Sequence, residues 1–163
     1  GYRLHVWSDD LPQMKRPGFQ VHDHIYGVRS RILLGALRDT QYIVKENAEG
    51  EYLLFSATGG KLCNTNKTVS CIKRSVSYFE AGEQYSVTKG DFHTSESVAP
   101  LTVTLFQKTD ADLSLSPQVV GPAYYEKMEL LSDDRTFDQK LAWRVMDTAL
   151  GEMRKKYLLD FFD

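Results

Sequence analysis

Three histidines are the residues in this 163-residue chain whose type and spacing best suit chemistry. His22 and His24 are two positions apart, and side chains at that spacing share one face of a β-strand. Both imidazoles can then converge on one point, with Asp23 facing the other way. A third ligand must come from a different strand, and His93 is the candidate. The pattern predicts a site for one divalent metal held by His22, His24 and His93.

Three neutral imidazoles would leave the charge of a bound metal uncompensated and several coordination positions open, as catalytic metals require. Imidazole suits iron, zinc, copper or nickel, and such a site attracts an anionic or bidentate substrate. Each imidazole also needs an acceptor for its other nitrogen, and Glu96, Thr104 and Gln107 are the candidates. The fourth histidine, His5, lies away from any motif and is expected to be structural or at the surface.

The residues that must position these histidines form short runs rich in β-branched and aromatic side chains, separated by turn residues. Strands are expected over residues 2–7, 19–28, 33–44 with a bend at Gly35, 52–55, 69–79, 84–87 and 101–106. So many short strands predict a mainly β fold, either a barrel or a sandwich. A barrel has the advantage that no strand edge is left exposed.

The tail changes to a helical period between residues 134 and 162. Apolar residues recur every four positions, and further apolar residues extend the stripe: Phe137, Leu141, Val145 and Ala149, with Ala142, Met146, Met153 and Tyr157. Ser132 or Asp133 could cap the start, and Gly151 could bend the helix. The stripe must be buried, either on the barrel or in a homodimer. We therefore expect a barrel over residues 1–131 and a packed helix over residues 132–163.

Composition narrows the classes of function. Hydrophobic residues make up 42% and charged residues 26%, with a net charge of -2, so neither nucleic acid nor an anionic membrane is an expected partner. No apolar run is long enough to span a bilayer, and the first residues lack a signal-peptide core. Cys63 and Cys71 are expected to be reduced thiols of a cytoplasmic protein, with one hairpin disulfide as the alternative.

The spacings around the histidines resemble the two motifs of the cupin superfamily. The first region carries Gly18, His22, His24 and Gly35, and the second carries Gly82, Gly90 and His93. Thr88 stands where proline is usual and Ser97 where asparagine is usual, while Val28 and Arg29 stand where a glutamate normally follows the histidine pair. The resemblance implies a single cupin-type β-barrel, a double-stranded β-helix, with a C-terminal α-helical segment.

Within the cupins, His22-Asp23-His24 and the stretch from Leu33 to Tyr42 resemble the cysteine dioxygenase (thiol dioxygenase) family. The resemblance covers roughly residues 18 to 108. It implies a mononuclear Fe(II) held by three histidines, with substrate and O2 binding together. The cysteine of animal-type members falls on Val28 or Arg29, the tyrosine cross-linked to it on Phe106, and the histidine that assists the tyrosine on Thr104. The cross-link therefore cannot form.

Four residues are expected to bind substrate: Arg29, Tyr26, Thr104 and Phe106. Arg29 could anchor a carboxylate if it points into the barrel, or it could lie on the solvent face of its strand. Tyr26 shares the histidine face by alternation. No separate catalytic acid or base is evident.

Three functions fit this pattern. The first is an Fe(II) dioxygenase-like oxidoreductase acting on a small amino-acid-like or carboxylate substrate with O2. The second is a non-oxidative Zn(II)-type cupin that catalyses isomerisation, lysis or rearrangement, such as N–N bond formation. The third is a ligand-sensing cupin without catalysis. The identity of the bound metal discriminates the first two.

Overall fold

A computed structural model describes residues 1–11, 18–59, 61–125, 130–131 and 138–158. In these residues the protein is mainly β, as expected, with a C-terminal helix. The elements are β1 (Tyr2–Ser8), β2 (Gly27–Leu34), β3 (Ala36–Glu46), β4 (Tyr52–Thr58), β5 (Lys61–Glu80), β6 (Gln84–Val87), β7 (Phe92–Ser97), β8 (Leu101–Thr109), β9 (Gln118–Pro122), a 3-10 turn (Ala123–Tyr125), β10 (Leu130–Leu131) and α1 (Gln139–Leu158).

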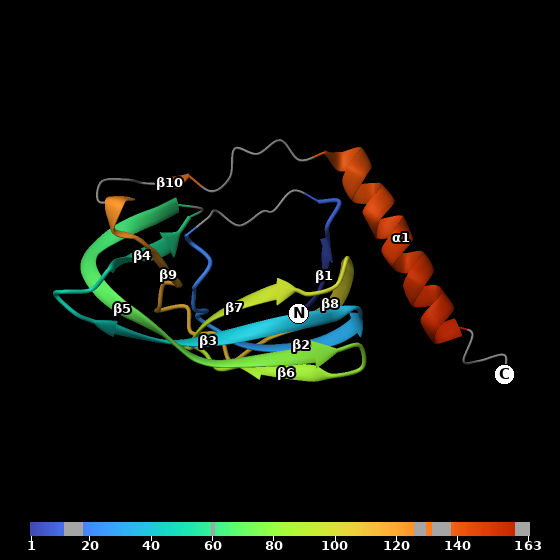
Figure 1. Ribbon diagram of the computed structural model, residues 1–163, viewed down its shortest axis with the longest axis horizontal. Helices are drawn as coiled ribbons and strands as arrows, with labels where there is room; N and C mark the ends of the chain where they lie inside the picture. Colours follow the sequence, from blue (N-terminus) through green and yellow to red (C-terminus); the bar gives the residue numbers. More distant parts are fainter. Residues whose placement is uncertain (12–17, 60, 126–129, 132–137, 159–163) are drawn as a thin grey trace.

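The strands form two antiparallel sheets (Figure 1). One has the order β1-β8-β2-β6, and the other has the order β7-β3-β5-β4-β9, with β10 paired to β5. The largest cluster of buried side chains draws on both sheets: Val28, Ile32, Leu37, Tyr85, Val87 and Phe106. The core therefore lies between the sheets, where alternate residues of each strand are removed from water.

A short extended segment around His22 joins the two edge strands of the larger sheet. His22 forms an isolated bridge with His93 of β7 and another with Val119 of β9. The strand ladders of the described residues do not close either sheet into a continuous barrel, so a cupin-type barrel stays a prediction. The strand expected over residues 19–28 begins only at Gly27, because the histidine segment makes these single bridges and no ladder.

Gly35 forms the sharp bend between β2 and β3 that the sequence indicates. Its φ is +74°, and a Cβ atom there would lie 2.2 Å from the carbonyl oxygen of Leu101. Only glycine tolerates both the left-handed backbone and this close approach. The bend places β2 in one sheet and β3 in the other, so the chain crosses between the two sheets at Gly35.

We expect Gly35→Ala to lower the free energy of unfolding by about 3 kcal/mol or more, because backbone strain and a steric clash add together. Gly90→Ala is the control. Gly90 has a similar φ of +81° and nothing within 4 Å of an added Cβ, so only strain of roughly 1 kcal/mol is expected. Urea unfolding of both variants measures the difference, and equal losses would show that the approach to Leu101 is unimportant.

The C-terminal helix packs on its own chain. α1 contacts β1, β2 and β8 at one end of the sheets (Figure 1). Val145 and Ala149 are buried, and the Tyr157 hydroxyl donates to the backbone carbonyl of Leu33 at 2.8 Å. Asp138 caps the helix, because its carboxylate accepts from the backbone N–H of Leu141 at 3.0 Å. The expected caps Ser132 and Asp133, with Phe137 and Phe162, lie outside the described residues.

The two cysteines cannot form the hairpin disulfide. Cys63 and Cys71 lie on the same strand, β5, eight residues apart, and both are free. An extended strand rises about 3.3 Å per residue, which separates the two thiols far beyond bonding distance. Within the described residues, no helix combines the length and apolar character that crossing a bilayer requires.

Candidate metal centre

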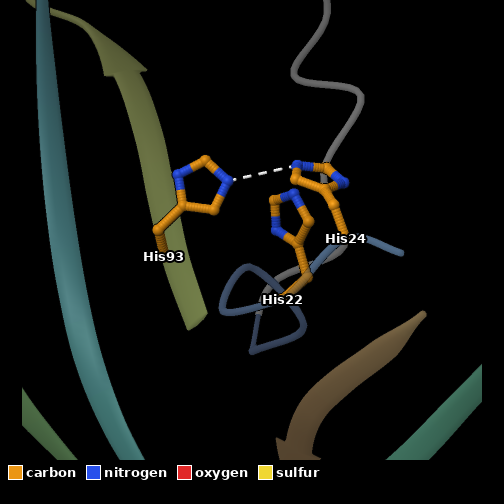
Figure 2. Close-up of side chains that lie close together, drawn as sticks. All are labelled: His22, His24 and His93. Carbon is orange, nitrogen blue, oxygen red and sulfur yellow. Dashed lines mark hydrogen bonds between the residues drawn. The ribbon is translucent and has the colours of Figure 1, made fainter. Parts of the chain in front are cut away.

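The structure brings His22, His24 and His93 together, as the sequence predicts. Each contributes one ring nitrogen to a group in which these nitrogens all lie within 4.8 Å of one another. The rings of His22 and His24 are 4.8 Å apart, and those of His24 and His93 are 5.2 Å apart. Figure 2 shows the three rings converging from β7 on one side and from the His22–His24 segment on the other. A group of this size and composition could hold one metal ion.

Backbone hydrogen bonds bring the two histidine-bearing segments into register. The N–H of His93 donates to the carbonyl of His22 at 2.9 Å, and the N–H of His22 donates to the carbonyl of His93 at 3.2 Å. On its other side His93 pairs with Gln41 of β3. Asp23 turns away from the rings, and its carboxylate accepts from the backbone N–H of Gln118. The alternation expected at His22-Asp23-His24 is therefore present, although the segment is not a regular strand.

Asp39 orients the His93 ring. The Nδ1 atom of His93 lies 2.8 Å from Oδ1 of Asp39, and the side chains are only 4% and 5% exposed. A carboxylate can only accept, so Nδ1 carries the proton and Nε2 is left with its lone pair free. Ser95 donates to the same oxygen at 3.0 Å, and its hydroxyl lies 3.2 Å from that of Tyr85 on β6. This chain of polar contacts connects the site to the opposite sheet.

The other two imidazoles are held in complementary ways. Nδ1 of His22 donates to the backbone carbonyl of Gln20 at 2.8 Å, so Nε2 is the unprotonated nitrogen of this ring. The Nε2 atoms of His24 and His93 are 3.2 Å apart, so His24 donates this hydrogen bond (Figure 2). Coordination of a metal through His24 Nε2 requires the other neutral tautomer of this ring, in which Nδ1 carries the proton.

The surroundings of His24 disfavour a positive charge on its ring. Burial lowers the pKa of His24 to about 3, and the neighbouring His22 and His93, then Lys108, contribute further to the decrease. The imidazole is therefore neutral at physiological pH, which is the form that binds a metal. The donor set fits a transition-metal ion because neutral nitrogens converge and one ligand is hydrogen-bonded to a carboxylate.

Aromatic side chains line one side of the histidines. The Tyr26 ring stacks on His24 at 5.0 Å with an angle of 14° between the planes. Phe106 meets Tyr26 edge-on at 6.3 Å, and Nζ of Lys108 lies 4.2 Å from the centre of the Tyr26 ring. Tyr26 therefore lies against His24, and Phe106 lies next to Tyr26.

Arg29 lies on the wrong face of its strand to act as the expected anchor. In β2 the buried Val28, Ser30 and Ile32 alternate with the exposed Arg29 and Arg31. Because side chains alternate across a strand, both arginines point away from the interior. The structure therefore does not bring Arg29 to the histidines.

The remaining sequence candidates lie at the edge of the site or outside it. Thr104 is fully buried on β8, two residues from Phe106, and among the described residues its hydroxyl has no hydrogen-bond partner. His5 stacks on Phe106 at 4.7 Å and is not a member of the ligand group. Glu96 pairs with Arg38, so it does not orient His93.

Sequence reasoning missed Asp39, Ser95 and Lys108. Two of them follow from alternation, since Ser95 is two residues after His93 and Lys108 two residues after Phe106. Asp39 carries a weaker signal, as a carboxylate inside a strand that is otherwise rich in apolar and β-branched residues.

Comparison of the chain with protein-family models, with curated proteins and with solved structures gives no match. The function is therefore inferred from the geometry of the histidine site and from the residues around it.

Proposed function

We propose that this protein is a mononuclear metal-dependent enzyme of the cupin type, an Fe(II) dioxygenase-like oxidoreductase that acts on a small amino-acid-like or carboxylate substrate. The observation that carries this proposal is the convergence of three imidazole nitrogens within 4.8 Å, one of them hydrogen-bonded to a buried carboxylate. Structural metal sites use four protein ligands, whereas three ligands leave positions for reactants.

The chain's own residues supply position and shielding. Asp39 and the Gln20 carbonyl fix the tautomers of His93 and His22, so both present Nε2 to the same point. Tyr26 and Phe106 cover one side of the site with aromatic surface and limit the access of water. Fe(II) held there would supply the redox chemistry that activates O2 for attack on the substrate.

The cupin architecture is part of the proposal. Two antiparallel sheets with a shared core, a glycine bend between β2 and β3, and a histidine segment lying between β7 and β9 support a double-stranded β-helix with a C-terminal helix. The half-buried thiols of Cys63 and Cys71 are compatible with a reducing, cytoplasmic location.

A non-oxidative, zinc-dependent reaction is the second candidate. By the sequence resemblance to thiol dioxygenases, Phe106 and Thr104 stand where that family carries a tyrosine and its assisting histidine, and neither side chain would serve as an acid or base. Three histidines with an open position also suit Zn(II), which polarises a substrate without redox chemistry.

The test is metal analysis of protein purified without added metal, followed by anaerobic reconstitution with Fe(II) and exposure to nitric oxide as a surrogate for O2. We expect about one iron per chain and the half-integer-spin electron paramagnetic resonance signal of an iron–nitrosyl centre. Stoichiometric zinc that Fe(II) cannot displace would favour the second candidate. Binding of neither metal would overturn the enzymatic proposal and favour a ligand-sensing protein.

A further inference from the structure

Lys108 is a positively charged residue that reaches the histidine site through its contact with Tyr26. On β8 it comes two residues after Phe106 and four after Thr104, which are both buried. Because every second side chain of a strand lies on the same face, the Lys108 side chain leaves the strand on this inward face. Its Nζ atom is 4.2 Å from the Tyr26 ring centre, and that ring is 5.0 Å from the His24 ring centre. The ammonium group and the His24 ring are therefore no farther apart than these two distances combined.

Several basic residues elsewhere in the chain are paired with a carboxylate. Lys67, Lys89 and Lys155 each lie within 4.0 Å of a carboxylate. In the described part of the chain no carboxylate comes that close to Lys108, although the residue is half-buried. A half-buried ammonium that lies over an aromatic face keeps hydrogen-bond donors for an incoming anion, because the ring takes none of its N–H groups in a conventional hydrogen bond.

We propose that Lys108 is the anion anchor of this site and binds the carboxylate of a small substrate whose other end faces His22, His24 and His93. This inference rests on the proposed function and adds the residue that selects the substrate. The short path from Lys108 across Tyr26 to His24 limits the substrate to a small molecule. Its chemical class is a carboxylate with a second oxygen, nitrogen or sulfur donor only a few bonds away. Arg29, the anchor suggested by the sequence, points away from the site.

The experiment uses the full chain loaded with Co(II), whose visible absorption reports changes at the metal. Malonate is the anionic probe and imidazole the neutral probe, each titrated into the wild type, Lys108→Met, Lys108→Arg and Arg29→Met. We expect Lys108→Met to weaken malonate binding about tenfold, as the loss of one charged hydrogen bond predicts. Imidazole binding should not change, and Lys108→Arg should stay within about threefold of the wild type.

Arg29→Met is the matched control, because it removes the same charge through the same substitution from the outer face. Malonate affinity equal in Lys108→Met and the wild type would overturn the anchor while leaving the metal site intact. An equal loss in both methionine variants would also overturn it, because the effect would then come from net charge. Absence of any Co(II) spectrum in the wild type would overturn the proposed function and the anchor together.

Discussion

Replacing His93 by alanine is expected to abolish stoichiometric metal binding, with a loss in affinity of roughly a hundredfold or more. Removing the hydrogen-bond partner of a metal ligand typically lowers metal affinity by about 10- to 100-fold. Removing the ligand itself should therefore lower the affinity by at least the upper end of that range. His22→Ala and His24→Ala should have the same effect, because all three rings belong to one group. Competition with a chromophoric chelator measures the affinity of each variant.

His5→Ala is the control for these variants, because His5 is a half-buried histidine outside the ligand group. Its metal affinity should equal that of the wild type. His93 is 3% exposed, so the His93→Ala variant also contains a cavity. His22 and His24 are only partly buried, so the His22→Ala and His24→Ala variants should lose less stability. If His93→Ala kept wild-type affinity in a folded protein, the site would not be the one described.

Asp39→Asn is expected to reduce metal affinity by about 10- to 100-fold while leaving the three ligands in place. The amide keeps the shape and one acceptor oxygen but loses the negative charge that Asp39 places 2.8 Å from His93 Nδ1. Asp39→Ala removes the acceptor altogether and leaves a buried N–H unpaired, which should lower the free energy of unfolding by roughly 1–3 kcal/mol. Chelator competition and urea unfolding separate the two effects.

Glu96→Gln provides the matched control. Glu96 is the carboxylate that the sequence suggested as a partner for a ligand, but it forms an ion pair with Arg38 on a partly exposed surface. We expect the Glu96→Gln substitution to change metal affinity by less than about twofold, because ion pairs at the surface contribute little energy. Equal effects of Glu96→Gln and Asp39→Asn would mean that long-range charge, and not orientation of His93, governs the affinity.

The strands and the helix whose apolar residues recur with a clear period could be predicted from the sequence. Residues 84–87 form a strand with the expected bounds, and residues 101–106 form most of β8, because alternation and turn residues mark them clearly. The helix stripe at Val145 and Ala149 is buried as its spacing indicates. The convergence of the three histidines was also predictable, since i and i+2 share a face and few other ligands were available.

The features that were not predicted from the sequence depend on tertiary contacts, which no local sequence pattern encodes. The inward or outward direction of Arg29 is set by a register in which Val28 and Ser30 face the core, and a shift of one residue would have reversed it. The pairing of Asp39 with His93 joins residues 54 positions apart through adjacent strands. Lys108 could be recognised only after Tyr26, which it contacts, was placed on His24.

The segment around His22 also bears on how this protein avoids aggregation through its strand edges. His22 bridges β7 and β9, the two strands at the edges of the larger sheet, through backbone groups that would otherwise be open to a neighbouring chain. Exposed edges favour strand addition and aggregation. The stretch that carries two of the candidate metal ligands therefore also pairs with a residue of each edge strand. Substitutions that loosen this segment should disturb the histidine group and expose these edges at the same time.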